Sequence, residues 1–413
     1  MEKQIVQILG LGYIGLPLAV TAVNSGLSVR GVDISSRVVL SLREGRVPID
    51  EPGLQDALDE ALGSGRLNLS EQMGSANIHV IAVPTPVSPD GRPDISVVEE
   101  VARGIKKVAR PGDLVIIEST CPVGTANVVA DIVNGGIPTE ESEPLVHIAS
   151  CPERILPGVA LHELKNNDRV IGGVTPICAE KAAAFYATFC SGELHISVTA
   201  NAAELIKLTE NSYRDVNIAF ANELSKLCDE ANTDVWNVIK LANMHPRVNI
   251  LQPGAGVGGH CIAVDPWFLV HAFPDQSTLI KKARQVNDEK PLWVVSKIDR
   301  LLNNRDSLDP YRIAIFGLTF KPDVDDIRES PSLKIASLLA ADDRCIVGAV
   351  EPHLEFLPTH LLEAGAMRLD VNDAADWADC CLILVRHSLF SKEKDKLRAH
   401  NNVLDICGLF SGE

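Results

Sequence analysis

The residue best suited to covalent chemistry is Cys261, which ends the stretch at residues 252–261. Four glycines lie within residues 254–259, just before it. Glycine lets a backbone approach a ligand closely, and a cysteine that ends such a loop is poorly placed to be core filler. An activated thiol there is a candidate nucleophile. We expect the adjacent His260 to contact a ligand rather than act as a base, because neighbouring side chains usually point apart.

Other polar groups near Cys261, or on one predicted helix, could serve the same reaction. Asp265 follows the cysteine by four residues. A carboxylate beside a thiol raises the thiol pKa, so Asp265 suits a later proton transfer better than thiolate formation. Lys207, Asn211 and Arg214 are spaced i, i+4 and i+7, which places them on one helix face. Lysine and asparagine there can stabilise a developing oxyanion. The alternative is an ordinary solvated face whose lysine pairs with nearby acids.

Residues 10–15 form a G-x-G-x-x-G turn that follows the apolar run 4–9 and opens a predicted helix. The three glycines would make the tight turn, admit a pyrophosphate and let the helix pack on the strand. Asp33 ends the next predicted strand, where an acid binds the adenine ribose and repels the extra phosphate of NADP. We therefore expect NAD, although a plain turn with a solvated acid is the alternative. The turn residues expected at the cofactor are Gly10, Gly12, Tyr13, Ile14 and Gly15.

Two later strand ends carry hydroxyl groups. Residues 83–86 include Thr85, and residues 118–124 include Thr120. Ligands of doubly wound sheets bind beyond the carboxyl ends of the strands, so we expect both threonines to lie at the cofactor. Ordinary turn chemistry is the alternative reading of these segments.

Lys321 and Arg328 are candidates for binding a second diphosphate. They lie in residues 320–330, after a strand that ends in glycine and before a predicted helix. Cations at such a strand end can hold phosphates. The alternative is local pairing with Asp323, Asp325 and Asp326.

The pattern of elements predicts the fold class. Short apolar runs that fit strands alternate with helical patterns, at residues 4–9, 29–33, 78–83, 114–118 and 147–150. Helical periodicity dominates at 201–231, 233–243 and 278–300, and strands return at 312–317, 346–350, 380–385 and 402–406. The expected α/β fold has two Rossmann-like doubly wound parallel-sheet domains, residues 1–198 and 301–413, joined by a central helical segment, residues 199–300.

The bulk composition argues against several classes of protein. A net charge of −17 disfavours a nucleic-acid partner, which needs basic patches. The chain has no apolar run of the ~18–20 residues that cross a bilayer, and its start leaves no room for a signal peptide, so we expect a cytoplasmic protein without membrane contact. The 10 cysteines include no CxxC pair. We expect no metal site, and nine of the ten as reduced, buried apolar residues.

Together these motifs resemble the UDP-glucose/GDP-mannose dehydrogenase family over essentially the whole chain. Within it, the chain looks like the branch that oxidises UDP-N-acetyl-D-mannosamine, a likeness carried by residues 209–224, 245–254 and 258–268. UDP-glucose members usually carry serine where this chain has His260. Ala255, in place of a frequent proline, and Cys121, in a variable loop, are departures that remove no catalytic group. The pieces that carry the resemblance are residues 10–15, 118–120, 151–154, 207–224, 245–254, 258–268 and 317–330.

The resemblance implies a four-electron oxidation of the sugar C6 alcohol to a carboxylate with two NAD⁺. Cys261 would carry a thiohemiacetal and then a thioester, because an aldehyde has no hydride to give until an addition makes C6 tetrahedral. By the same resemblance Lys207 and Asn211 stabilise the oxyanion. Asp265 and Thr120 act as general base or orient water, and Glu153 assists thioester hydrolysis.

The resemblance also implies a set of substrate contacts and an assembly. The central helices would form a homodimer in which Arg247 reaches the neighbouring subunit's substrate, and the product would serve polysaccharide biosynthesis. The implied substrate contacts are Glu153, Arg154, Lys207, Asn211, Arg214, His245, Arg247, Gly254, Gly258, His260, Lys321 and Arg328.

Three other functions stay open from the residues alone. The substrate could be UDP-N-acetylglucosamine or UDP-glucose, with unchanged chemistry. A two-electron β-hydroxyacid dehydrogenase would share the three-part architecture but leave Cys261 without a role. A non-catalytic UDP-sugar sensor would bind without turnover.

Overall fold

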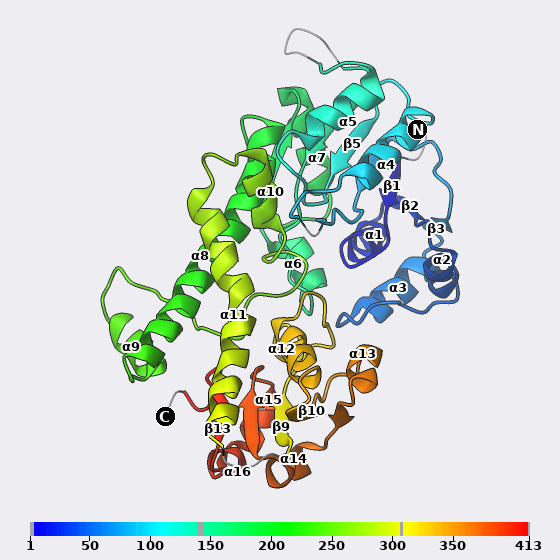
Figure 1. Ribbon diagram of the computed structural model, residues 1–413. Coiled ribbons are helices and arrows are strands. Elements are labelled where there is room, and N and C mark those ends of the chain that lie inside the picture. Colours follow the sequence, from blue (N-terminus) through cyan, green and yellow to red (C-terminus); the bar gives the residue numbers. More distant parts are fainter. Residues whose placement is uncertain (1–3, 89, 139–143, 306–308, 412–413) are drawn as a thin grey trace. The chain divides into compact units, whose positions relative to one another are not determined.

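The computed structural model describes residues 4–88, 90–138, 144–305 and 309–411 (Figure 1). The chain divides into two compact units. The first comprises Met1–Glu210 with Trp267–Ala272, and the second comprises Asn211–Pro266 with Phe273–Glu413. The long helix α8, Ala200–Glu230, begins in the first unit and ends in the second.

The first unit is built on an eight-stranded sheet in the order β3-β2-β1-β4-β5-β6-β7-β8. Its first six positions follow the Rossmann order 3-2-1-4-5-6 and are all parallel, which confirms the predicted fold class. The strands are β1 Ile5–Leu9, β2 Ser28–Val32, β3 Leu67–Ser70, β4 Ile78–Ile81, β5 Leu114–Ile117, β6 His147–Ser150, β7 Arg169–Gly173 and β8 Leu194–Ile196.

Strand β7 departs from the expected parallel sheet, because it pairs antiparallel with β6. The connection between them begins with an irregular stretch and holds only the seven-residue helix α6, Ala160–Asn166. An antiparallel neighbour begins at the end of the sheet where the previous strand stopped, so no helix has to carry the chain back along the sheet. The chain therefore starts β7 near the end of the sheet where β6 stopped.

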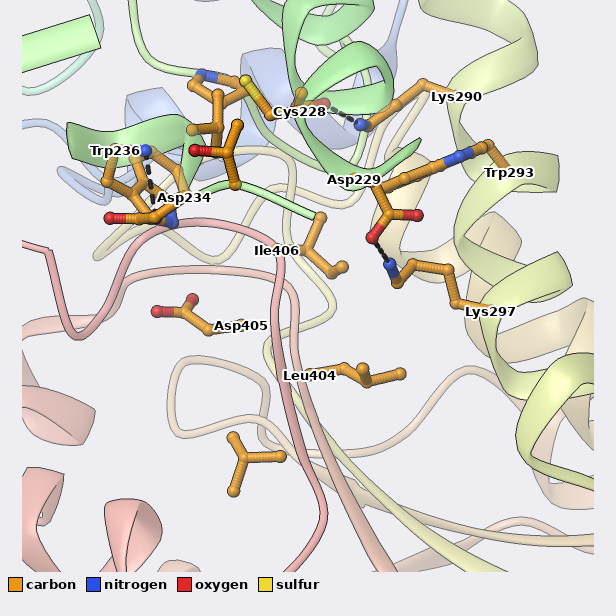
Figure 2. A pocket seen from close by; sticks show the side chains of 15 residues that line it. Cys228, Asp229, Asp234, Trp236, Lys290, Trp293, Lys297, Leu404, Asp405 and Ile406 are labelled. Carbon is orange, nitrogen blue, oxygen red and sulfur yellow. Dashed lines mark hydrogen bonds and ion pairs between the residues drawn. The ribbon is translucent and has the colours of Figure 1, made fainter. Parts of the chain in front are cut away.

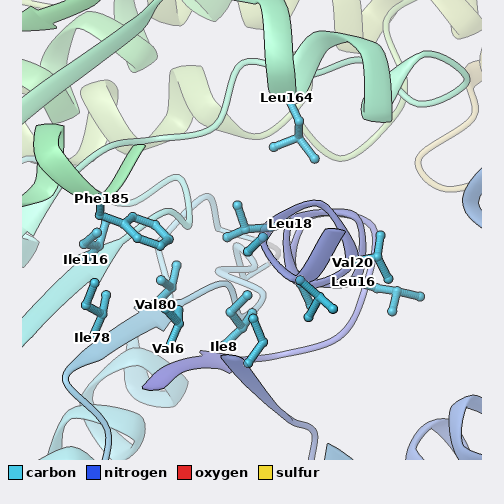
Figure 3. Packing of buried hydrophobic residues seen from close by; sticks show 14 of the residues in the cluster. Val6, Ile8, Leu16, Leu18, Val20, Ile78, Val80, Ile116, Leu164 and Phe185 are labelled. Carbon is cyan, nitrogen blue, oxygen red and sulfur yellow. The ribbon is translucent and has the colours of Figure 1, made fainter. Parts of the chain in front are cut away.

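Helices cover both faces of this sheet. In the strands, side chains alternate, so Val6 and Ile8 of β1 face one apolar cluster while Leu9 faces the other. Helix α1 packs on the first cluster (Figure 3), and every residue from Gly15 to Val23 is buried. The helices of this unit are α1 Gly15–Asn24, α2 Ser36–Arg43, α3 Leu54–Gly63, α4 Ser96–Lys106, α5 Thr125–Asn134, α6 and α7 Pro176–Tyr186.

The second unit contains a five-stranded parallel sheet in the order β11-β10-β9-β12-β13. Four of its strands match the predicted ones within a few residues, and the two-residue β11 was missed. Its strands are β9 Tyr311–Phe316, β10 Cys345–Val350, β11 Met367–Arg368, β12 Cys380–Ile383 and β13 Val403–Asp405. Its further helices are α9 Val235–Ala242, α11 Thr278–Asn303, α12 Pro331–Ala340, α13 Thr359–Glu363, α14 Val371–Trp377, α15 Ser388–Lys392 and α16 Lys394–Arg398; α10, Asp265–Ala272, spans the division between the units.

The predicted long helices are confirmed in α8, α9 and α11. Across the described ranges of the chain, none of the helices combines the length and apolar character needed to cross a membrane.

Candidate active site

The glycine turn between β1 and α1 has the geometry of a dinucleotide site. Gly10 adopts φ +95°, and a Cβ built on Gly15 would lie 1.9 Å from the carbonyl oxygen of Gly10. Both positions therefore require glycine. Among the described residues, no atom lies within 4 Å of a Cβ built on Gly12, so this side of the turn stays open to a pyrophosphate.

Asp33 organises the same turn through both carboxylate oxygens. Oδ2 accepts a hydrogen bond from the Leu11 N–H at 2.9 Å, and Oδ1 accepts one from the Ser35 N–H at 2.8 Å. Each oxygen has a second lone pair that a ribose hydroxyl can use. Ile34, which follows directly, is 93% exposed and offers an apolar surface beside that acid. Sequence reasoning missed Ile34, because one apolar residue after a strand carries no distinguishing signal.

The ends of β4 and β5 are joined by hydroxyl groups. Ser119 Oγ accepts from the Val83 N–H at 2.9 Å and donates to the Val83 carbonyl at 2.7 Å. Thr85 Oγ1 donates to the carbonyl of Thr120 at 2.5 Å. The serine, which was not predicted to be a site residue, therefore fixes the two strand ends, and the Thr85 hydroxyl already serves as a donor to this loop.

Two acids and two cations form a buried group in the first unit. Lys207 Nζ lies 3.8 Å from Glu153 Oε1, and Arg169 Nη1 lies 3.0 Å from Glu118 Oε1. The Glu153 N–H also donates to the carbonyl of Glu118 at 3.1 Å. All four residues are at most 7% exposed. Lys207 and Glu153, which were predicted as site residues for separate roles, thus lie in contact, and Glu118 and Arg169 lie beside them.

Burial shifts the acids of this group toward their neutral forms. It raises the pKa of Glu118 to about 6 against the opposing effect of Arg169, and it raises the pKa of Glu153 against that of Lys207. A carboxyl group whose pKa lies nearer to neutral can both take up and release a proton at physiological pH.

In the second unit, three glycines of the loop at residues 254–259, Gly256, Gly258 and Gly259, pack against the chain itself. A Cβ on Gly258 would lie 2.6 Å from the carbonyl oxygen of Glu329 and 2.7 Å from Phe320 Cβ. Gly259 has φ +81°, and its N–H donates to the Arg328 carbonyl at 3.0 Å. The glycines were expected to let the backbone come close to a ligand. At Gly258 and Gly259 the backbone instead comes close to residues 320–331 of the chain itself.

The loop ends in a turn that joins Cys261 to Asp265. The Asp265 N–H donates to the Cys261 carbonyl at 2.8 Å, and Asp265 opens helix α10. Its Oδ2 accepts from Asn211 Nδ2 at 2.5 Å. Asp265 and Asn211 are buried, whereas Cys261 is half-buried. The second unit therefore brings three of the predicted catalytic residues into one turn and the helix α8 beside it.

Comparison with known proteins fits this set of groups. Family models match residues 4–190, 201–289 and 314–411, as the NAD binding domain, the central domain and the UDP binding domain of one family. The chain belongs to the UDP-glucose/GDP-mannose dehydrogenase family. The cofactor is therefore NAD, and the open turn at Gly12 with the acid at Asp33 fits it.

Several relatives match the chain over nearly its full length. An NDP-N-acetyl-D-galactosaminuronic acid dehydrogenase from Ralstonia nicotianae is 44% identical, covering 100% of this chain and 98% of its own. A UDP-N-acetyl-D-mannosamine dehydrogenase from Campylobacter jejuni is 46% identical, covering 94% and 97%. The solved UDP-D-ManNAc dehydrogenase from Pyrococcus horikoshii has a TM-score of 0.88 at 32% identity, covering 99% and 97%.

Some predicted substrate contacts already have partners within the chain. Arg154 forms an ion pair with Glu210, and Arg328 makes a two-point contact with Asp326, with Nη2 at 2.6 Å from Oδ2. The local pairing considered for Arg328 is thus present. Lys321 Nζ lies 5.8 Å from the centre of the Phe320 ring.

Other predicted contacts of this family member lie on the surface. Arg214, His245 and Arg247 are exposed, and so is His260. Lys207, Asn211 and Arg214 were expected on one face of α8. They differ in exposure, because Lys207 and Asn211 are buried and Arg214 is not. The Arg247 N–H donates to His245 Nδ1 at 3.3 Å, which joins two of these exposed residues in one turn.

The second sheet repeats the turn geometry of the first. Gly317 has φ +93°, and Glu351, which follows β10, accepts from the Leu318 N–H at 2.7 Å as Asp33 accepts from Leu11. Here the acid is 2% exposed, and His387 Nε2 lies 3.2 Å from its Oε2. His387 thus closes the position that Asp33 leaves open to a ribose.

His387 also belongs to a group with Asp323 and His353 whose potential ligand atoms lie within 4.8 Å of one another. Its Nδ1 accepts from the Asp323 N–H at 3.0 Å, and its Nε2 faces Glu351. Both ring nitrogens are therefore used within the protein, and this group is a weak candidate for a metal ion.

The cysteines divide less sharply than expected. Cys121 and five others are buried, whereas Cys190, Cys345 and Cys407 are half-buried, as Cys261 is. Exposure alone therefore does not distinguish Cys261 from the other half-buried cysteines, and its candidacy rests on its place after the glycine-rich loop.

A cavity of about 210 Å³ in the second unit is separate from the predicted site residues. Figure 2 shows Trp236, Trp293 and Lys290 among its lining residues. The Lys290 amine lies 3.7 Å from the centre of the Trp293 ring and is hydrogen-bonded to Ser225. Burial lowers the pKa of Lys290 to about 7.

Proposed function

We propose that the chain is an NAD-dependent UDP-N-acetyl-D-mannosamine dehydrogenase that forms the uronate. The observation that carries the proposal is the anchored loop that ends in Cys261, with the Asn211–Asp265 pair at the same turn. The names of several relatives, at 44–46% identity, support the sugar.

The chemistry assigns a separate role to each group. NAD⁺, when bound at residues 10–15 and Asp33, accepts a hydride in each of two oxidations. Between them the Cys261 thiolate adds to the C6 aldehyde, which gives a thiohemiacetal whose alkoxide takes up a proton. Oxidation of that adduct leaves a thioester, and water then displaces the thiolate and releases the acid.

The polar groups serve the charges and protons of these steps. Lys207 and Asn211 would stabilise the oxyanion that develops at C6. Asp265, with Thr120, would hold or deprotonate the attacking water. The raised pKa of Glu153 suits proton transfer during thioester hydrolysis.

The remaining predicted contacts would recognise the nucleotide sugar. Lys321 and Arg328 supply the cations for a diphosphate in a chain whose net charge is −17. Arg328 would have to share its guanidinium between the substrate and Asp326, which five N–H donors allow. Arg154, Arg214, His245, Arg247, Gly254, Gly258 and His260 complete the proposed set.

A nucleotide of N-acetyl-D-galactosamine, which differs from N-acetyl-D-mannosamine at C2 and C4, is a second candidate substrate. The Ralstonia nicotianae relative is named for an N-acetyl-D-galactosaminuronic acid, at 44% identity over the whole chain. UDP-N-acetylglucosamine and UDP-glucose remain the alternatives with unchanged chemistry.

We also propose a cytoplasmic homodimer formed through the central helical segment. The proposed boundaries of that segment remain the predicted ones, residues 199–300. Tyr213, Phe220 and Leu227 of α8 are each more than half exposed and spaced by seven residues, which sets them on one side of the helix. A second copy of this helix would cover them. Polysaccharide biosynthesis is the proposed use of the product.

The test is the amount of NADH formed per sugar nucleotide consumed. Two NADH per UDP-N-acetyl-D-mannosamine, with little from the galactosamine, glucosamine or glucose nucleotides run in parallel, is the expected result. Two NADH from another sugar would replace the substrate and keep the mechanism. One NADH, or none, would overturn the four-electron assignment.

A variant locates the covalent step. Cys261→Ser should retain the fold and lose acid formation, because an alkoxide leaves the ester far less readily than a thiolate. Cys190→Ser, at another half-buried cysteine, is the matched control and should keep activity. Normal uronate production by Cys261→Ser would refute the thioester.

A further inference from the structure

A line of buried hydrogen bonds connects the two long helices to the start of the loop that carries Cys261. The Gly254 N–H donates to Asn222 Oδ1 at 2.9 Å, and Asn222 Nδ2 donates to Asn287 Oδ1 at 2.9 Å. Asn287 Nδ2 then donates to Asp215 Oδ1 at 2.8 Å. Asn222, Asn287 and Asp215 are at most 1% exposed.

The groups at the two ends determine the orientation of both amides. A backbone N–H can only donate, so the Asn222 oxygen must face Gly254 and its nitrogen must face Asn287. An ionised carboxylate can only accept, so the Asn287 nitrogen must face Asp215. Reversing either amide would put like groups in contact at two places inside a buried region, where unsatisfied groups are costly.

A buried cation holds the far end of the line. Arg284 Nη1 donates to Asp215 Oδ1 at 2.6 Å, and the arginine is 1% exposed. Arg284 and Asn287 lie on α11, whereas Asp215 and Asn222 lie on α8. The line therefore ties the two helices together before it reaches the loop.

The loop is also held further along, so the geometry of the nucleophile depends on several contacts. Gly259 donates to the Arg328 carbonyl, and Cys261 accepts from Asp265. A Cβ on Gly256 would come within 3.2 Å of the Asn287 carbonyl oxygen, which places the loop against the same asparagine. Cys261 follows the anchor at Gly254 by seven positions.

We propose that Asn222 and Asn287 are positioning residues for the nucleophile, which they hold by anchoring the loop at Gly254. The inference rests on the proposed function only in naming Cys261 as the nucleophile. Without the amide of Asn222, the Gly254 N–H loses its buried acceptor and the loop samples more positions. A reacting atom displaced by about 1 Å can lose on the order of 100-fold in rate.

The first experiment compares Asn222→Ala with Asn134→Ala in the full chain. Asn134 makes a matched pair of hydrogen bonds to the backbone of Val146, at 3.0 and 2.9 Å, within the first unit and outside the predicted site. Asn222→Ala should lower kcat for uronate formation about 10- to 100-fold and change KM for NAD less than about twofold. Asn134→Ala should lower Tm to a similar extent and leave kcat near wild type.

The second experiment needs no substrate. Alkylation of Cys261 by iodoacetamide, followed by peptide mass spectrometry, should be several-fold faster in Asn222→Ala than in wild type or Asn134→Ala. If wild type oxidises no sugar nucleotide, the proposed function fails while this measurement still tests the anchor. Equal alkylation rates in all three proteins would overturn the positioning role.

A third variant guards against poor folding of Asn222→Ala. Asn222→Asp keeps an acceptor for Gly254 and loses the donor to Asn287. If the hydrogen bond from Gly254 is what matters most, Cys261 in Asn222→Asp should be alkylated at nearly the wild-type rate. Fast alkylation in Asn222→Asp would show that the line through Asn287 holds the loop, and slow alkylation in both variants would overturn the proposal.

Discussion

Asn211 Nδ2 donates to Asp265 Oδ2 at 2.5 Å, and both residues are at least nine-tenths buried. The contact joins helix α8 to the residue that opens α10, four positions after the proposed nucleophile. An amide paired with a carboxylate keeps one negative charge in place and aims a donor at it. The pair thus places a hydrogen-bond donor for an oxyanion, Asn211, in contact with a potential base, Asp265.

Asn211→Asp should change the pH dependence of activity. Two carboxylates in contact share a proton, so the apparent pKa of the pair rises above that of either acid alone. Above that pKa both groups are charged and activity should fall about 100-fold. Below it, the singly protonated pair restores the hydrogen bond, so the ratio of variant to wild-type kcat should rise as pH falls. Asn217→Asp on the same helix is the control, and a pH-independent ratio would argue against the pair.

Asp33→Ser should weaken NAD binding and relax cofactor choice. The Leu11 N–H loses a charged acceptor, and the ribose loses the same partner, which corresponds to about a tenfold rise in KM for NAD. Loss of the negative charge should also raise kcat/KM for NADP relative to NAD. Steady-state kinetics with both cofactors measure the effect, and an unchanged ratio would show that Asp33 does not select the cofactor.

Gly258→Ala should destabilise the second unit. The added methyl group would meet the backbone of Glu329 at 2.6 Å and Phe320 Cβ at 2.7 Å, neither of which is the end of a flexible side chain. We expect a loss of about 2 kcal/mol in the free energy of unfolding. Gly254→Ala is the matched control for stability, because no described atom lies within 4 Å of its added Cβ. Equal denaturation midpoints for the two variants would contradict the packing.

Lys290 should make stability rise with pH. The amine is protonated up to its ordinary pKa of 10.5 in the unfolded chain, but burial lowers its folded pKa to about 7. Between these values the unfolded chain binds more protons, so the free energy of unfolding should increase from pH 7 toward 10.5. Relative to Lys290→Met, the gain over that whole window should be on the order of 5 kcal/mol, since each pKa unit corresponds to about 1.4 kcal/mol. Denaturant titrations at several pH values give the free energy of unfolding of both proteins. If the two plots of that free energy against pH run parallel, the amine stays charged in the folded protein and the prediction is wrong.

Phe220→Asp should shift the protein toward monomers. The side chain is 57% exposed on the apolar side of α8, and a charge there would be buried without a partner in the proposed dimer. Phe356→Asp changes a side chain that is 75% exposed outside that helix and should leave the oligomeric state as in wild type. Light scattering after gel filtration gives the mass; a dimeric Phe220→Asp would exclude this face.

Local patterns were sufficient to predict most of the elements and the two candidate sites. The apolar runs located nine of the thirteen strands that the structure describes, because a strand buried on both faces needs successive apolar side chains; β3, β7, β8 and β11 were missed. The glycines at 10 and 15 and the acid at 33 predicted the cofactor turn, because a left-handed φ and a close backbone contact admit no other residue. Residues 254–261 likewise predicted the loop of the proposed nucleophile from composition alone.

The tertiary structure decided which polar groups are free to meet a ligand. Arg328 pairs with Asp326, and Arg154 pairs with Glu210, although the sequence left both arginines as candidate substrate contacts. It also brought Asn222 to Gly254 and Arg169 to Glu118, over separations of 32 and 51 residues. No periodicity encodes such contacts, because they depend on how helices and strands pack rather than on neighbours along the chain. Sequence alone determined most of the elements, the cofactor turn and the candidate nucleophile; the three-dimensional packing decided which partners hold them, because burial makes each unpaired polar group costly.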